Sequence, residues 1–476
     1  MISTQLKDPS GDAVGYCEVT GYVAPSIGFL LRLPSDHWNG KFFETGCGGA
    51  CGTFDWISRC AEPLRKGYAC IVSDGGHKST VNDLKWAYNN PQAPIDYLVR
   101  APHVTALAGK AIVERYYNKA PQKSYFMGCS AGGIQALWET QRFPWDFDGI
   151  VAVGPALHTT GVIINALWAN RALMGKTGEP VLGDTDLELL HQAVVAKCDM
   201  NDGIKDGVIG DPRACHFSPS ELRCTSSKPN HCLTAEQIEA VEKIYGGPVT
   251  SKGEQIVRPA ALKGSERTWP IWFGGSEHRP TTFPFYRFVG DWFRYSYFQP
   301  NPGPTWKTED FDFDSDYKRL GMAEGMDPVN PDLRRFKVAG GKLMVVTGWN
   351  DAIEGALRTV DYYETVEKIM GGRAETQDFF RLFVIPGMEH CGAGDGAFAV
   401  DYLSYLEAWV EKGEAPDHLV GSHLRLADPA EAYNPKFPLD PAKIEFSRPV
   451  YPYPTTAKYL GHGNPNDAAN FGPAKP

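Results

Sequence analysis

The sequence has no run rich in lysine and arginine, and its formal net charge is −10 over 476 residues. The electrostatic footprint of a nucleic-acid-binding protein is therefore missing, and we expect no nucleic-acid partner. A long uncharged stretch, 150–170, includes Gly154, Pro155 and Asn165, which argue against a membrane-spanning helix, so we expect no membrane partner either. Hydrophobic residues nevertheless make up 42% and aromatic residues 12% of the chain, which excludes a wholly disordered protein.

The chain also lacks CxxC pairs with zinc-finger spacing, although it contains 11 cysteines. They are Cys17, Cys47, Cys51, Cys60, Cys70, Cys129, Cys198, Cys215, Cys224, Cys232 and Cys391. So many thiols without a metal motif favour a secreted or periplasmic protein with disulfide bonds. The opening, MISTQLKDPSGD, does not have the pattern of a signal peptide, so we expect either that one was removed or that the protein is not exported. The odd count leaves at least one cysteine without a partner in the chain.

Short apolar runs of strand length alternate with segments of helical periodicity at both ends of the chain, and this alternation favours a parallel sheet. Strands are predicted at 28–34, 41–45, 68–73, 123–127, 149–153, 342–347 and 381–385, and helices at 103–117, from Ser130 to about 143, and at 356–369 and 402–412. The alternation is absent from about 160 to 335. We therefore predict an α/β domain formed by 1–159 and 336–476 and interrupted by an inserted domain, 160–335. The last 60 residues are predicted to wrap irregularly over it.

Gly128-Cys129-Ser130-Ala131-Gly132 is a GxSxG motif between a predicted strand and a predicted helix. This is the strand–turn–helix context of a nucleophile elbow, in which the glycines keep the turn free of Cβ atoms that would collide with neighbouring backbone. Ser130 is therefore the candidate nucleophile. The alternative is an ordinary glycine-rich connection between a strand and a helix.

A serine hydroxyl needs a base that accepts its proton, and in this fold the acid and the histidine follow the serine in that order, each after a strand. Asp351 and His390 have those positions. His77 is the best rival base, and Asp361 and Asp395 are less well placed acids. Asp351 also has an alternative role as a cap of the helix that follows it.

Cys129 directly precedes Ser130, and Cys391 directly follows His390. If the serine and the histidine meet, the two cysteines are brought together as well, and a disulfide between them would hold the catalytic pair in place. Two buried free cysteines are the alternative.

With these residues the sequence resembles the tannase and feruloyl esterase family, which also includes the hydrolase of mono(hydroxyethyl) terephthalate. The resemblance lies in WNGKFFETGCGGACG, RKGYACIVSDGGH, YFMGCSAGG and VIPGMEHCGAGDG, and in a Cys-Ser-Asp-His-Cys set formed by Cys129, Ser130, Asp351, His390 and Cys391. It implies an α/β-hydrolase fold with a large inserted lid and a serine esterase activity on aromatic esters. Family members usually extend further upstream, so the pairing of Cys17, Cys47, Cys51, Cys60 and Cys70 stays open.

An oxyanion hole requires one backbone N–H from the residue after the nucleophile and one from a loop after an early strand. Ala131 supplies the first. The loop after strand 41–45 looks like the family's oxyanion loop, and Gly48 and Gly49 are equal candidates for the second. An ordinary tight turn is the alternative.

Asp199, Asp202 and Asp206 place three carboxylates on one short stretch of the insertion, where a cation would relieve their repulsion, and hard oxygen ligands suit Ca²⁺. The resemblance implies a structural calcium site that also uses the carbonyls of Ile204 and Val208. It further implies the disulfides Cys198–Cys215 and Cys224–Cys232. A series of solvated Asp-Gly turns is the alternative.

Aromatic side chains of the insertion are candidates for a pocket that binds an aromatic ester, although each is equally expected in the core of the lid. They are Trp269, Trp272, Phe273, Trp292 and Phe293. Arg267, Arg279 and Arg287 are candidates for contact with an acidic substrate group, with surface solvation as the better expectation. No organic cofactor is expected.

We predict a serine carboxylic ester hydrolase, with feruloyl-type esters as the leading substrates. Galloyl esters and terephthalate monoesters are the rival substrates, and transfer of the acyl group to an alcohol is a further possibility. The alternative from another class is a calcium-stabilised protein that binds phenolic compounds.

Overall fold

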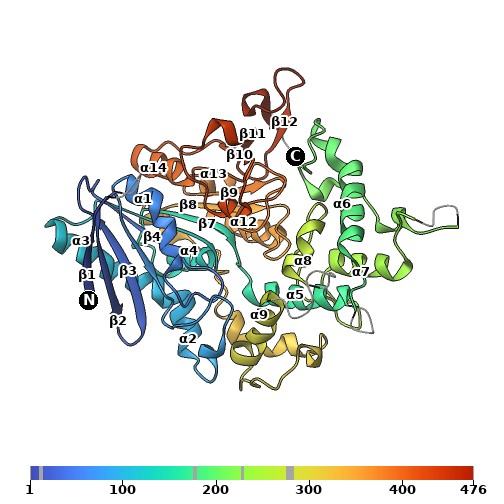
Figure 1. Ribbon diagram of the computed structural model, residues 1–476, viewed down its shortest axis with the longest axis horizontal. Coiled ribbons are helices and arrows are strands. Elements are labelled where there is room, and N and C mark those ends of the chain that lie inside the picture. Colours follow the sequence, from blue (N-terminus) through green and yellow to red (C-terminus); the bar gives the residue numbers. More distant parts are fainter. Residues whose placement is uncertain (1, 10–13, 175–178, 227–229, 275–283, 475–476) are drawn as a thin grey trace.

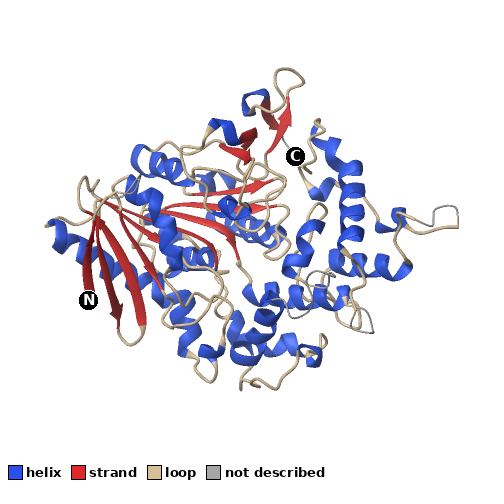
Figure 2. Cartoon of the chain, in the orientation of Figure 1, coloured by secondary structure: helices blue, strands red, loops and turns tan. Residues whose placement is uncertain are grey.

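The computed structural model describes residues 2–9, 14–174, 179–226, 230–274 and 284–474. Nine of its described strands form one sheet in the order β1-β2-β3-β5-β4-β6-β7-β8-β9. The bounds are β1 Ser3–Lys7, β2 Tyr16–Val23, β3 Ile27–Pro34, β4 Lys41–Thr45, β5 Ala69–Ser73, β6 Lys123–Ser130, β7 Gly149–Pro155, β8 Lys342–Gly348 and β9 Phe380–Ile385. Figure 2 shows these strands as one twisted fan with helices packed along it.

The sheet is mixed, and the prediction of a parallel sheet is correct only for its central and C-terminal strands. Strands β5, β4, β6, β7, β8 and β9 run parallel, whereas β1, β2 and β3 add to β5 in antiparallel fashion. Strand β1, STQLK, is mostly exposed, so it has little of the apolar pattern that identifies a buried strand. That is why β1 and β2 were not expected from the sequence.

Helices cover both faces of the sheet because the central strands are apolar on both sides. On β4, Phe42 packs into the core on the face covered by α3 Ala101–Tyr117, α4 Ala131–Arg142 and α12 Ala356–Met370. Its neighbour Phe43 points the other way, toward the core beneath α14 Tyr402–Lys412. The remaining helices of this unit are α1 Ala61–Arg65, α2 Gln92–Ile95 and α13 Arg373–Gln377. This layered arrangement is the α/β-hydrolase fold that the resemblance implies.

The chain leaves the sheet after β7 and returns in β8, although these two strands are hydrogen-bonded neighbours. The intervening segment is helical and occupies the right side of the view in green and yellow (Figure 1). Its helices are α5 Thr159–Leu173, α6 Asp184–Cys198, α7 Ala235–Gly246, α8 Trp269–Trp272, α9 Pro284–Trp292, α10 Gly321–Glu324 and α11 Arg334–Val338. Buried residues such as Leu190, Val241 and Phe293 form its core, which is continuous with buried residues of the α/β unit such as Ile134 and Trp138. We call this segment the lid. The exact domain boundaries stay a prediction.

The C-terminal segment is more regular than predicted. Strands β10 Leu419–Leu424 and β11 Ile444–Val450 pair with each other, as do β12 Thr456–Tyr459 and β13 Phe471–Ala474. They rise beside the lid at the top of the view (Figure 1). None of the described helices is both long enough and apolar enough to cross a membrane.

Candidate active site

Ser130 lies where β6 ends and α4 begins, in a turn that the flanking glycines make possible. Its φ is +59°, a left-handed value that a non-glycine residue rarely adopts and that marks local strain. A Cβ on Gly128 would lie 2.3 Å from the carbonyl oxygen of Gly132, and one on Gly132 would lie 2.8 Å from that of Cys47. The motif therefore needs glycine at both places, and the turn lifts the serine above the sheet.

Asp351 and His390 meet on the loops that follow β8 and β9. The His390 Nδ1 to Asp351 Oδ2 distance is 2.9 Å, and the two residues are 8% and 1% exposed. Burial lowers the pKa of His390, but the charge and hydrogen bond of Asp351 and the charge of Glu354 outweigh it, so the pKa is raised overall. An Nδ1–H bonded to a buried carboxylate fixes the tautomer and leaves Nε2 free to act as a base.

Ser130 and His390 line one cavity of about 300 Å³ at the boundary between the sheet and the lid. In the described part of the chain no hydrogen bond joins the two side chains. A serine–histidine contact of this kind often tightens only when substrate binds. The cavity is large enough for a small aromatic ester.

The rival residues have other partners. His77 stacks on Trp86 and contacts the carbonyl oxygen of Ala50 through Nε2. Asp361 pairs with Arg258, and Asp395 pairs with Arg267. The cap of α12 is Gly355, so Asp351 does not serve as the cap of that helix.

The three candidate oxyanion donors line the same cavity. Ala131 is the first residue of α4, so its N–H has no partner within the helix. Among the described residues, no hydrogen bond takes up the N–H of Gly48 or Gly49, whereas the Gly49 carbonyl accepts from the Tyr97 hydroxyl. Both glycines therefore remain candidates for the second donor.

The structure joins Cys129 to Cys391, with their Cα atoms 5.8 Å apart, and so links the serine turn to the histidine loop. It also joins the two pairs that the resemblance implies in the lid, Cys198–Cys215 and Cys224–Cys232. The pairing left open near the N-terminus is Cys47–Cys51 and Cys60–Cys70, with Cys17 free.

The lid contributes aromatic side chains to the cavity, but only some of those predicted. Trp272 and Trp292 line it, and the Trp272 ring meets the His390 ring edge-on at 5.1 Å between centroids. Trp269, Phe273 and Phe293 belong instead to the core of the lid.

The two predicted arginines that the structure describes, Arg267 and Arg287, do not line the cavity. Arg267 forms ion pairs away from it, and Arg287 is exposed. Arg279 lies outside the described residues.

Among the cavity residues that the sequence analysis missed are three with polar groups: Trp56, Arg59 and Glu354. Trp56 and Arg59 lie in the short helical segment Asp55–Cys60, and Glu354 follows Asp351 on the loop after β8. Burial raises the pKa of Glu354 to about 8, and its Oε1 lies 3.8 Å from His390 Nε2. The position of Glu354 close to the candidate acid was the only available signal, because isolated polar residues in loops carry no motif.

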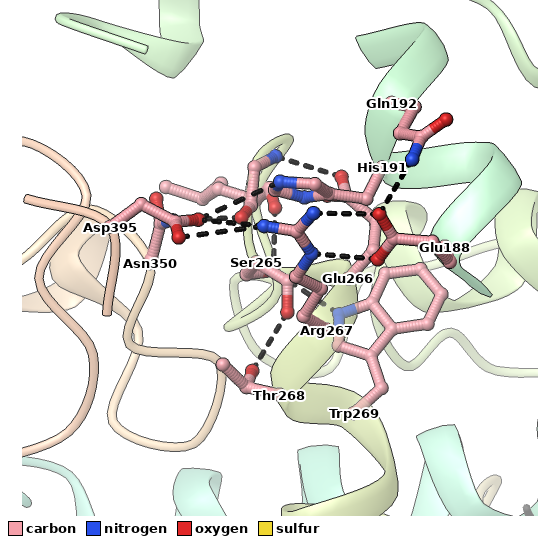
Figure 3. A network of polar contacts seen from close by, with 12 residues as sticks. Glu188, His191, Gln192, Ser265, Glu266, Arg267, Thr268, Trp269, Asn350 and Asp395 are labelled. Atoms are coloured by element: carbon pink, nitrogen blue, oxygen red, sulfur yellow. Dashed lines mark hydrogen bonds and ion pairs between the residues drawn. The ribbon is translucent and has the colours of Figure 1, made fainter. Parts of the chain in front are cut away.

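A polar network ties the lid to the loops of the candidate acid and histidine (Figure 3). Arg267 contacts both carboxylate oxygens of Glu188 at 2.7 Å and reaches Asp395, on the histidine loop, at 3.4 Å. Asn350, next to the candidate acid, donates to the carbonyl oxygen of Gly264 at 2.7 Å. The lid is therefore held against the loops of both the candidate acid and the candidate histidine.

The three aspartates of the predicted calcium loop lie close enough to affect one another. Burial raises the pKa of Asp202 to about 7, and the charges of Asp206 and Asp199 add to the rise. Arg448, 2.6 Å from Asp206, is the one cation that forms an ion pair with this set in the described part of the chain. The three aspartates are not among the described groups whose ligand atoms all lie within 4.8 Å of one another. The donor set of carboxylate oxygens suits a hard cation.

Comparisons with known proteins place this architecture in context. A family model described as "Tannase and feruloyl esterase" matches residues 11–474. The chain is 33% identical to the mono(2-hydroxyethyl) terephthalate hydrolase of Piscinibacter sakaiensis, over 97% of this chain and 85% of that protein. It is 32% identical to a probable feruloyl esterase B-2 of Aspergillus flavus, over 88% of this chain and 84% of that protein.

Solved structures are similar as well. Feruloyl esterase B from Aspergillus oryzae has a TM-score of 0.85 and 26% identity, covering 98% of this chain and 92% of that one. A tannin acyl hydrolase from Aspergillus niger has a TM-score of 0.80 at 19% identity, covering 100% of this chain and 90% of that one, which shows the fold alone.

Proposed function

Because the chain belongs to the tannase and feruloyl esterase family and is a hydrolase of aromatic carboxylic esters, we propose that Ser130, His390 and Asp351 carry out the reaction through an acyl-enzyme. The observation that carries this proposal is the geometry: a serine on a strained elbow and a histidine bonded to a buried aspartate line one cavity.

In this mechanism Ser130 Oγ attacks the ester carbonyl, and His390 Nε2 takes the hydroxyl proton. Asp351 holds the imidazole in the required tautomer and stabilises its charged form. The amides of Ala131 and of Gly48 or Gly49 stabilise the negative charge on the tetrahedral intermediate. His390 then gives the proton to the leaving alcohol, and water activated by the same histidine releases the acid.

The aromatic lining of the cavity supports a flat aromatic acyl group as the part that is recognised. Trp272 and Trp292 offer ring faces and edges that favour stacking with such a group. We propose feruloyl-type esters as the leading substrates, with galloyl esters and terephthalate monoesters as the alternatives within the class.

The experiment that tests this function measures initial hydrolysis rates on methyl ferulate, methyl gallate and mono(hydroxyethyl) terephthalate. Wild type is compared with Ser130→Ala and with Ser220→Ala, which removes an exposed lid serine as a matched control. We expect hydrolysis by wild type and Ser220→Ala, no hydrolysis by Ser130→Ala, and labelling of Ser130 by a fluorophosphonate. An active Ser130→Ala variant would contradict the proposal.

We also propose a structural calcium ion in the lid, held by Asp199, Asp202 and Asp206 with the carbonyls of Ile204 and Val208. Support comes from three clustered carboxylates with a single arginine partner. Such an ion would cross-link the loop and take no part in the chemistry. The five disulfides in turn support our proposal that the protein works in an oxidising compartment, outside the cytosol.

A further inference from the structure

Arg59 brings a positive charge to the catalytic cavity without a partner of opposite charge. It lines the cavity together with Ser130 and His390, and its charge acts on the pKa of His390. Among the described residues, no hydrogen bond or ion pair joins its guanidinium to an acid. Arg59 is partly buried, so its guanidinium is accessible from the cavity. A guanidinium without an acid partner beside a nucleophile is suited to bind a carboxylate or phosphate, because its fork of N–H groups matches their oxygen atoms.

The acids closest to Arg59 along the chain have other partners. Asp55 accepts a hydrogen bond from the hydroxyl of Thr53. Glu62 pairs with Arg65 and lies 4.0 Å from the ammonium of Lys66. The local sequence therefore supplies carboxylates within reach of this helical segment, and the fold directs them elsewhere.

The guanidinium packs on an aromatic ring, and in the part of the chain that the structure describes no hydrogen bond uses its N–H groups. The carbon at its centre lies 4.6 Å from the centroid of the Trp56 ring. That ring in turn lies against Gly48, where an added Cβ would be 2.5 Å from it. Stacking on a ring leaves the edge of the guanidinium free to form two parallel hydrogen bonds with a carboxylate. The Trp56 Nε1–H is also buried and without an acceptor, so a second donor is available beside it.

A comparison with Arg358 shows that Arg59 is unusual. Burial lowers the pKa of each arginine to about 10, so both stay charged at neutral pH. The charge of Arg358 is opposed by Glu354, Asp351 and Asp327, whereas burial alone acts on Arg59. Arg59 is only partly buried, and none of its nitrogens is among the fully buried atoms without a partner in the described residues. Its charge is therefore not opposed by an acid of the protein, and an anionic ligand could take the place of the water around it.

We propose that Arg59 binds a carboxylate of the substrate and makes the enzyme selective for aromatic esters that carry a negative charge. The inference rests on the proposed function of the Ser130 site. Glu354, on another loop of the cavity, contacts His390 and shows no interaction with Arg59. The acid on this second loop therefore does not neutralise Arg59, whose charge stays available to a substrate carboxylate.

The carboxylate belongs either to the acyl half or to the alcohol half of the ester, and two matched substrate pairs distinguish these sources. Methyl 4-carboxybenzoate and methyl 4-carbamoylbenzoate differ only by a charge on the acyl half. The feruloyl esters of glycolic acid and of glycolamide differ only by a charge on the alcohol half.

The test compares kcat/KM on the four esters for wild type, Arg59→Gln, Arg59→Lys and Arg115→Gln. Arg115→Gln removes the same charge from an exposed site on α3 and serves as the control. We expect Arg59→Gln to lower kcat/KM for the charged ester of one pair by at least about tenfold, mainly through KM, and to change its neutral partner by less than about twofold. Arg59→Lys should retain part of the preference, and Arg115→Gln all of it.

If the ratio of kcat/KM for the charged ester to kcat/KM for its neutral partner is the same in wild type and in Arg59→Gln, the inference is overturned and the proposed function is left intact. Failure of wild type on all four esters, with no labelling of Ser130, would overturn both. If Arg59→Gln does not fold, the salt dependence of KM in the wild-type enzyme tests the inference instead. The KM of the charged ester should rise with NaCl while that of its neutral partner does not, and equal salt dependence would overturn the inference.

Discussion

Asp351 divides its two carboxylate oxygens between His390 and the backbone of its own loop. Oδ2 lies 2.9 Å from His390 Nδ1, while Oδ1 accepts hydrogen bonds from the backbone N–H groups of Ile353 and Glu354 at 3.2 and 2.9 Å. The amides fix the carboxylate, so the carboxylate can fix the imidazole. The sequence order of serine, acid and histidine predicts this pairing, but not the second set of bonds, which makes the acid rigid.

We expect Asp351→Asn to lower kcat by roughly 10²- to 10⁴-fold, because the amide neither selects the tautomer nor stabilises the imidazolium. The rate requires neutral His390, whose raised pKa places the acid limb of kcat/KM at a higher pH than for an ordinary histidine. Loss of the Asp351 charge lowers that pKa, so the acid limb should move to lower pH. Rates measured from pH 5 to 9 test this. An unchanged limb would show that Asp351 does not interact with the base.

The disulfide Cys129–Cys391 should matter for both stability and rate. Its sequence separation is 262, against 8 for Cys224–Cys232, so loop-closure entropy gives it about 5 kcal/mol against about 2 to 3 kcal/mol for the shorter loop. We expect the double alanine variant at 129 and 391 to lose stability and kcat. The matched variant at 224 and 232 should lose stability alone. Urea unfolding measures the loss of stability, and hydrolysis rates measure the loss of kcat. An equal kcat in both variants would contradict a catalytic role for the Cys129–Cys391 disulfide.

The sequence predicts the central strands of the sheet and the turn at Ser130 because both have strong local signals. Central strands such as β4, 41–45, carry apolar side chains on both faces. The positions beside Ser130 require glycine, because a Cβ there would collide with neighbouring backbone atoms. Strand β1 has no such signal, since an exposed edge strand needs only backbone pairing.

The cavity walls could not be predicted in the same way. Arg59 and Glu354 belong to the same cavity because the fold brings the segment after β4 and the loop after β8 together. Neither has a motif, and their unusual electrostatics arise from burial, which a single sequence does not reveal. The aromatic residues of the lid show the same limit: Trp272 lines the cavity and Phe273, the next residue, is in the lid core.

Glu354 should make the stability of the protein fall as the pH rises. Its folded pKa of about 8 lies above the usual 4.5, so the folded protein keeps a proton that the unfolded chain releases between these values. The stabilisation is fully present below pH 4.5 and is lost as the pH rises through 8. Glu354→Gln has no carboxyl group that titrates at this position. Between pH 5 and 8.5 its free energy of unfolding should therefore fall less than that of wild type, by roughly a few kcal/mol.

Urea unfolding at pH 5, 7 and 8.5 measures the difference. Glu114→Gln, at an exposed position on α3, is the control and should follow wild type. Identical pH slopes for wild type and Glu354→Gln would mean that the carboxyl group ionises normally in the folded protein.

Removal of calcium should destabilise the lid, if the three aspartates hold the ion. An ion that binds only the folded state stabilises it by about 4 kcal/mol at a thousand times its Kd, so EDTA should lower Tm by about 2 °C or more. Asp202→Asn should lower Tm on its own and remove the response to EDTA, because it deletes a ligand. Asp36→Asn, at an exposed site outside the lid, should leave both unchanged. Arg448 already neutralises part of the charge of Asp206. If EDTA leaves the melting curve unchanged and elemental analysis finds no calcium, this arginine, and not a metal ion, holds the loop together.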